Sequence, residues 1–165
     1  MLIENNENYI LWSENIFNTI KYLSDLELQK LTWSGKHPEF VSSFTETLAS
    51  LYDDLDFERF ISYYQLIEGV DGSYKLMSEL NELIKQFKEF GYETESNDNG
   101  YELILSNSNW IEITKKALKF VQINDKKNGG AKSQGGTSGN KINGVSADNK
   151  NAKKYDNAAQ KEFGN

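Results

Sequence analysis

The 165-residue sequence contains no cysteine, one proline and one histidine. Without cysteine the chain has neither a disulfide framework nor a thiolate that could act as a nucleophile or metal ligand. The single histidine, His37, lies between Lys36 and Pro38 in an expected loop, so no general base is paired with a nucleophile. No glycine-rich phosphate loop follows a predicted strand. The sequence therefore predicts a protein that is not an enzyme and that uses no cofactor.

A long apolar run is also missing. No segment approaches the roughly 18 apolar residues that a membrane-spanning helix needs. Acidic residues occupy the N-terminal segment, where a secretory signal carries positive charge. We therefore expect a cytoplasmic protein that does not bind membranes.

Basic residues are scarce in the first three quarters of the chain. Residues 1–124 contain 21 acidic and 10 basic residues, a formal charge of −11. Residues 125–165 contain four acidic and eight basic residues, a formal charge of +4. Because phosphate binding depends on Lys and Arg contacts, the acidic body is expected to repel nucleic acid and to attract basic protein surfaces.

Apolar spacing predicts a mainly α (α+β) fold, a single helical domain of five or six helices with one small β-hairpin, over residues 1–124. The strongest helical pattern covers residues 73–90, and Gly91 is expected to end that helix. Residues 60–67 have helical spacing, although their β-branched and aromatic content also fits a strand. The expected helices span residues 13–23, 25–33, 44–51, 57–67, 73–90 and 109–121.

The hairpin is predicted over residues 92–105. Its turn, Asn97-Asp98-Asn99-Gly100, contains an Asn-Gly pair, which supplies the positive φ angles that such turns need. The same turn matches the first half of a calcium-binding loop. However, Ser106 stands where that loop requires a bidentate Glu, so we expect no metal site.

The last 41 residues, 125–165, form a low-complexity tail rich in Gly, Asn and Lys. It holds seven of the twelve glycines and only two aromatic residues, Tyr155 and Phe163. Such a composition cannot bury enough apolar surface to offset the entropy lost on ordering, so we expect this tail to be disordered. Residues 147–163 are compatible with a short helix that forms only against a partner surface.

The segment from Leu31 to Phe60 carries the candidate partner-binding site. One interpretation is a solvated helix boundary, with Asp53 or Asp54 as the N-cap of the next helix. The other is the edge of a binding surface, in which an aromatic anchor lies beside carboxylates that steer a basic ligand. The candidate residues are Trp33, His37, Asp53, Asp54, Asp56 and Glu58.

Two runs, LSDLELQKLTWSGKHPEF and LYDDLDFERF, occur in this small, acidic, cysteine-free domain. With that general character, they resemble the immunity proteins encoded beside bacterial polymorphic toxins, including those of contact-dependent growth inhibition systems. The resemblance covers residues 1–124. It implies a role rather than an architecture, namely binding a cognate toxin, often a nuclease, and blocking its active site or its access to substrate. The alternative is a non-catalytic helical adaptor or regulatory domain that binds another protein.

Overall fold

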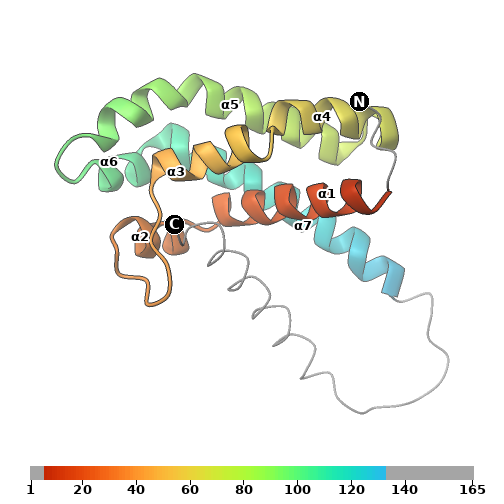
Figure 1. Ribbon diagram of the computed structural model, residues 1–165, viewed down its shortest axis with the longest axis horizontal. Helices are drawn as coiled ribbons and strands as arrows, with labels where there is room; N and C mark the ends of the chain where they lie inside the picture. The colour runs from red at the N-terminus through yellow and green to blue at the C-terminus, as the bar shows by residue number, and fades with distance from the viewer. Residues whose placement is uncertain (1–5, 133–165) are drawn as a thin grey trace, which may run out of the picture.

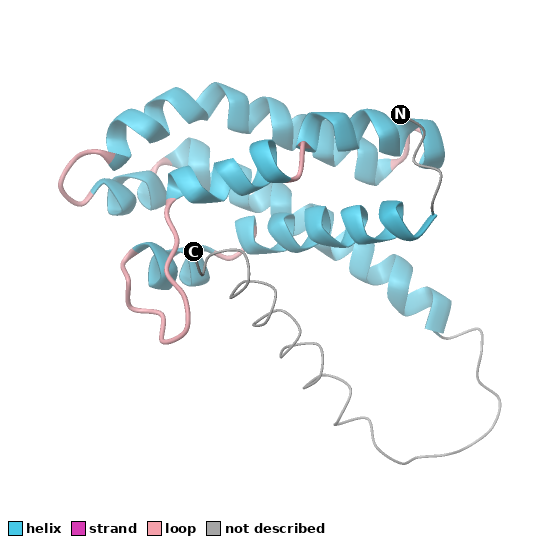
Figure 2. Cartoon of the chain, in the orientation of Figure 1, coloured by secondary structure: helices cyan, strands magenta, loops and turns pink. Residues whose placement is uncertain are grey.

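The computed structural model describes residues 6–132, and all regular structure in that part of the chain is helical (Figures 1 and 2). The mainly α prediction is thus confirmed. The elements are α1 (Asn6–Leu23), α2 (Leu26–Trp33), α3 (Phe44–Ala49), a π-helical turn η1 (Ser50–Asp54), α4 (Phe57–Glu68), α5 (Gly72–Glu95), α6 (Gly100–Ser106) and α7 (Ser108–Lys132).

The C-terminal helix α7 organises the packing. It lies against α5 on one side and against α1 on another, while α4 packs on α5 and the short α2 and α6 meet at one end (Figure 1). Each helix contributes apolar side chains to one core. The bulkiest of its fully buried side chains are Trp110, Phe44, Phe57, Phe60 and Phe120.

Gln29 is a polar residue inside this core, and it is fully buried. Its Nε2 donates to the carbonyl oxygens of Tyr22 at 3.0 Å and Leu23 at 2.9 Å, at the end of α1. Its Oε1 accepts a hydrogen bond from Nε1 of Trp110 at 2.9 Å. One amide therefore satisfies terminal carbonyls of α1 that the helix itself leaves unpaired, and it also binds α7.

Phe44 packs directly on the backbone of α5 at Gly91. Its ring centroid lies 5.4 Å from that of Trp110 and 5.9 Å from that of Phe87. A Cβ atom at Gly91 would lie only 2.1 Å from Cζ of Phe44. The prediction that Gly91 ends a helix is therefore wrong. It lies inside α5, where glycine is needed for close approach of the ring.

The predicted β-hairpin over residues 92–105 is also wrong, because no strand occurs anywhere in residues 6–132. Residues 92–95 complete α5, and α6 begins at Gly100. Asn99 has the expected positive φ, 58°, but the chain reverses between two helices. Gly100 allows this tight reversal, since a Cβ there would lie 2.2 Å from the carbonyl oxygen of Thr94. An Asn-Gly turn signal reports local backbone angles and does not distinguish helices from strands on either side.

Helix α7 passes through residue 124, the predicted end of the body, and continues to Lys132. The rest of the predicted tail, residues 133–165, lies outside the described residues. The short helix predicted over residues 147–163 lies there too.

The contact between Phe44 and Gly91 predicts a position-specific effect of alanine. Gly91→Ala should destabilise the fold by about 2 kcal/mol or more, because the new methyl group displaces a buried ring. Gly129→Ala, where a Cβ meets nothing within 4 Å, is the matched control. It should be neutral or stabilise α7 by up to about 1 kcal/mol. Urea unfolding followed by circular dichroism measures both, and equal stability of the two variants would contradict the packing described.

Candidate functional site

Trp33 lies in the core and does not project from the surface. Its side chain is 8% exposed, and its ring centroid lies 5.8 Å from that of Trp110 and 6.2 Å from that of Phe44. Its buried Nε1 has no hydrogen-bond partner within residues 6–132. Trp33 therefore stabilises the fold and is not the exposed aromatic anchor considered above.

His37 organises the loop between α2 and α3. Its Nδ1 accepts hydrogen bonds from the backbone N–H groups of Glu39 at 3.2 Å and Phe40 at 3.1 Å. Its ring also packs against that of Phe40, with centroids 5.3 Å apart. No hydrogen bond, ion pair or ring contact within residues 6–132 joins His37 to the acidic cluster, so these contacts do not bring the predicted residues together as one site.

The acidic cluster does not cap α4 as expected. Asp53 and Asp54 are the last residues of η1, because the helix that begins at α3 continues as a π-helical turn instead of ending. The N-cap position of α4 is Asp56, which has a left-handed backbone with φ of 48° and makes no side-chain cap bond. All three carboxylates are exposed.

Glu58, in the first turn of α4, is occupied by structural contacts. It accepts from Nζ of Lys85 at 2.7 Å and from Nδ2 of Asn81 at 3.4 Å. The hydrogen bonds from Lys85 and Asn81 lower the pKa of Glu58. This carboxylate joins α4 to α5 and is less available to a partner than the exposed carboxylates of η1.

An exposed aromatic ring does lie beside acidic residues, but it belongs to Tyr92 on α5. The side chain is 43% exposed, and its ring packs on Phe44 with centroids 5.5 Å apart. Burial raises the pKa of the Tyr92 hydroxyl, and the negative charges of Asp53, Glu95 and Glu89 raise it further. Carboxylates of η1 and α5 thus act electrostatically on one hydroxyl, and we call Asp53, Glu89, Tyr92 and Glu95 the Tyr92 face.

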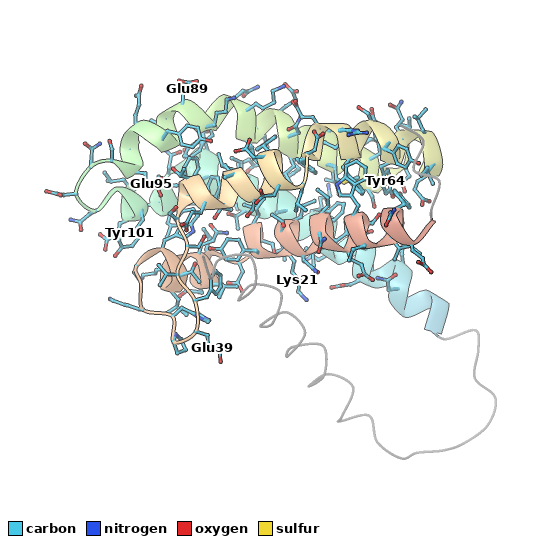
Figure 3. All side chains as sticks on the ribbon, viewed as in Figure 1. Lys21, Glu39, Tyr64, Glu89, Glu95 and Tyr101 are labelled. Carbon is cyan, nitrogen blue, oxygen red and sulfur yellow. The ribbon has the colours of Figure 1, made fainter. Side chains whose placement is uncertain are left out.

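Figure 3 shows Glu89 and Glu95 on α5, where the spacing of three residues from each to Tyr92 places them near one another on the helix. That spacing is visible in the sequence. The predicted hairpin conceals it, because residues 89, 92 and 95 do not form one surface when Tyr92 and Glu95 lie in a strand.

Glu95 also fixes the Tyr92 face to α3. Its carboxylate accepts from the backbone N–H of Phe44 at 2.8 Å and from that of Thr45 at 3.2 Å, and the Thr45 hydroxyl donates to it as well. A carboxylate at a helix N-terminus satisfies free N–H groups and suits the positive end of the helix dipole. The Tyr92 face is therefore built on α5 and joined to α3 by these hydrogen bonds.

A second acidic surface is a groove of about 450 Å³ between α5 and α7. Nζ of Lys116 donates to Glu79 at 2.8 Å, and this hydrogen bond lowers the pKa of Glu79. Neither Glu82 nor Glu112 forms an ion pair with any described residue. The groove is lined by Ser78, Glu79, Glu82, Leu83, Glu112 and Lys116.

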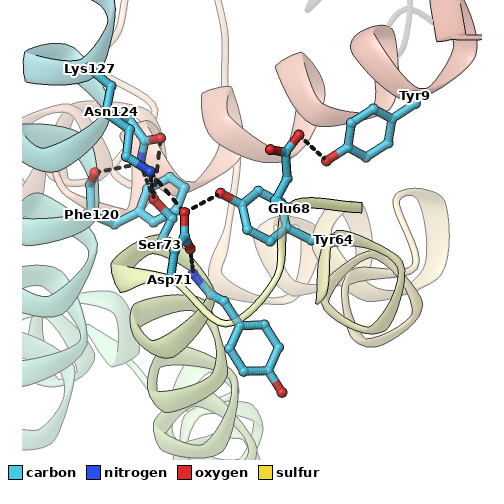
Figure 4. Close-up of polar contacts among 9 residues, drawn as sticks. Tyr9, Tyr64, Glu68, Asp71, Ser73, Phe120, Asn124 and Lys127 are labelled. Carbon is cyan, nitrogen blue, oxygen red and sulfur yellow. Dashed lines mark hydrogen bonds and ion pairs between the residues drawn. The ribbon is translucent and has the colours of Figure 1, made fainter. Parts of the chain in front are cut away.

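Asp71 joins α5 to the far end of α7 (Figure 4). Its Oδ1 accepts from the backbone N–H of Tyr74 at 2.8 Å, which caps α5. Its Oδ2 accepts from Nζ of Lys127 at 2.9 Å and from the hydroxyl of Tyr64 at 3.1 Å. Burial alone raises the pKa of Asp71, but the hydrogen bonds from Tyr74, Lys127 and Tyr64 outweigh it, so the pKa is lowered.

Residues 6–132 contain neither a candidate metal site nor a helix that could span a membrane. In that range, no three or more His, Asp or Glu side chains are grouped so that they could hold a metal ion. None of the helices there is both long and apolar enough to cross a bilayer.

The lowered pKa of Asp71 predicts a pH-dependent contribution to stability. An aspartate ionises near pH 3.9 in the unfolded chain, so the contribution is present above roughly pH 4 and is lost as pH falls through the folded value. Asparagine caps a helix as well as aspartate, so Asp71→Asn removes mainly the charge that Lys127 and Tyr64 bind, and it should lower the free energy of unfolding by about 1 kcal/mol at neutral pH and by less near roughly pH 3.

Urea unfolding at the two pH values measures this change. Asp98→Asn, in the exposed turn before α6, is the control and should show no such dependence. If the difference in free energy of unfolding between wild type and Asp71→Asn does not change with pH, the ionised carboxylate of Asp71 does not contribute to stability in this way.

Comparison of the chain with protein-family models, with curated proteins and with solved structures found no match in any of the three.

Proposed function

We propose that this chain is an immunity-type inhibitor, which binds a basic protein toxin and blocks it without catalysing a reaction. The observation that carries the proposal is the Tyr92 face, where an exposed aromatic ring lies within the electrostatic influence of carboxylates on η1 and α5. The resemblance of residues 23–40 and 51–60 to immunity proteins supports a toxin as the partner.

Tyr92 has the properties of a binding anchor. Tyrosine is enriched at interface positions that contribute most of the binding energy. Its ring is held in place by Phe44 beneath it, with ring centroids 5.5 Å apart, so little side-chain entropy is lost when a partner covers it. We infer that Tyr92 takes the role considered for Trp33, whose side chain is buried.

The charge of the face supports a basic partner. Asp53 and Glu89 are exposed, and neither forms an ion pair within the described part of the chain. Opposite charge accelerates encounter, because it steers the two proteins together over about a Debye length, roughly 8 Å at physiological ionic strength. A nuclease toxin must attract phosphate and is therefore positively charged near its active site, where this face would bind and exclude nucleic acid.

The electrostatic part of the proposal is tested by charge reversal on the face. Asp53→Lys with Glu89→Lys should slow association with the toxin encoded beside this chain by about tenfold or more at low salt. The matched control, Glu14→Lys with Glu27→Lys, changes the net charge equally on exposed positions of α1 and α2. It should have a clearly smaller effect. Association rates measured at two salt concentrations test the electrostatic steering, and growth rescue on co-expression tests whether the chain protects cells from the toxin.

Tyr92→Ala should act mainly on dissociation, because an anchor is lost while the steering charges remain. Its unfolding curve identifies any loss of stability from the missing contact with Phe44. If Asp53→Lys with Glu89→Lys leaves the association rate unchanged, or if growth rescue does not depend on residues of the Tyr92 face, this face is not the toxin-binding surface. If the chain binds a basic protein but does not protect cells from its neighbouring toxin, the adaptor alternative is favoured instead.

A further inference from the structure

We propose that the groove between α5 and α7 is a docking site for the chain's own basic segment, residues 150–154, which binds it in cis. The segment Lys150-Asn151-Ala152-Lys153-Lys154 has three lysines and no acidic residue. The groove offers carboxylates from both of its helices. The docking itself is independent of the proposed function, because it needs no partner protein.

The groove has an excess of acceptors for such a segment. Glu79 is already paired with Lys116 at 2.8 Å, whereas Glu82 and Glu112 form no ion pair with any residue in the range 6–132. Leu83 also lines the groove. Lysine side chains suit this combination, because their aliphatic stems cover apolar surface while the ammonium groups reach carboxylates.

The length of the connecting chain fits the distance it has to span. From Lys116 at the groove to Lys132 at the end of α7, the helix covers about 24 Å at 1.5 Å per residue. Residues 133–149 provide 17 residues of connecting chain, four of them glycine and three serine. A coil of that length has a root-mean-square span of about 23 Å, close to the required distance.

Because the span of the linker matches the required distance, weak binding is sufficient for the segment to occupy the groove. A short flexible linker whose average length equals the span gives an effective concentration on the order of millimolar. A contact with a dissociation constant of about a millimolar would then be occupied roughly half of the time. The groove is also nearer than the Tyr92 face to the helix from which the segment extends, so it is the favoured acidic surface.

Docking would also weaken the negative field of the Tyr92 face. This consequence rests on the proposed function, whereas the docking itself does not. Glu82 and Glu89 are seven residues apart on α5, which is about 10 Å along one side of the helix. Lysines bound at Glu82 therefore weaken the negative field at Glu89. The segment would act as an internal competitor that slows association with a basic partner.

A nitroxide spin label tests the docking in the full chain. Because the sequence has no cysteine, Ala152→Cys provides a unique attachment point that leaves all three lysines in place. We expect amide NMR signals of residues 79–83 and 112–116 to lose intensity relative to the same sample with the nitroxide reduced. The loss should disappear when NaCl is raised from about 0.1 M to about 1 M, because the Debye length falls from about 10 Å to about 3 Å.

Substitutions in the groove and in the lysine segment distinguish docking at this site from non-specific electrostatic attraction to the acidic body. In the labelled chain, Glu82→Gln with Glu112→Gln should abolish the loss of intensity, and so should Lys150→Gln with Lys153→Gln and Lys154→Gln. The control, Glu14→Gln with Glu27→Gln, removes the same charge from exposed positions of α1 and α2 and should leave the loss unchanged.

Three results would overturn the proposal. The first is intensity loss that is absent, or that is spread evenly over the body. The second is loss centred on the Tyr92 face and insensitive to the groove substitutions. The third is equal loss in a mixture of spin-labelled chain and isotope-labelled chain without the spin label, which would show binding between copies instead of within one chain.

Discussion

The buried amide of Gln29 is the interaction on which the arrangement of the helices depends. In a low-dielectric core, a donor or acceptor left unpaired costs about 1–3 kcal/mol, so Gln29 strongly favours the one geometry in which its partners on α1 and α7 are both present. That geometry places the ring of Trp110 against Phe44, with ring centroids 5.4 Å apart. The three hydrogen bonds of Gln29 thus favour one packing of the helices around the aromatic cluster.

The candidate site follows from the same cluster. Phe44 packs on Gly91 from inside and supports the ring of Tyr92, while Glu95 binds the first backbone N–H groups of α3. Core packing and a helix cap therefore support this surface from beneath. A rigid aromatic ring and fixed carboxylates need little reorganisation on binding, which favours recognition of another protein.

The acidic residues of this chain have two different roles, and their neighbours determine which one applies. Asp71 and Glu58 accept hydrogen bonds that join helices, and their pKa values are lowered accordingly. Asp53, Glu82 and Glu89 are exposed and form no ion pair with any described residue. Exposed pairs contribute little to stability, so the unpaired carboxylates are retained at small energetic cost and remain available for steering or docking.

The sequence by itself determined the helical class and the charge distribution, because apolar spacing and ionisable residues act locally and can be counted. Only the tertiary structure decided the roles of Gly91, Trp33 and Tyr92. Gly91 permits contact with Phe44, which is 47 residues away in the chain, and Trp33 is buried by Trp110, which is 77 residues away. Local patterns contain no information about such distant neighbours. From the sequence alone, a glycine that ends a helix therefore cannot be distinguished from a glycine that leaves room for a packed aromatic ring.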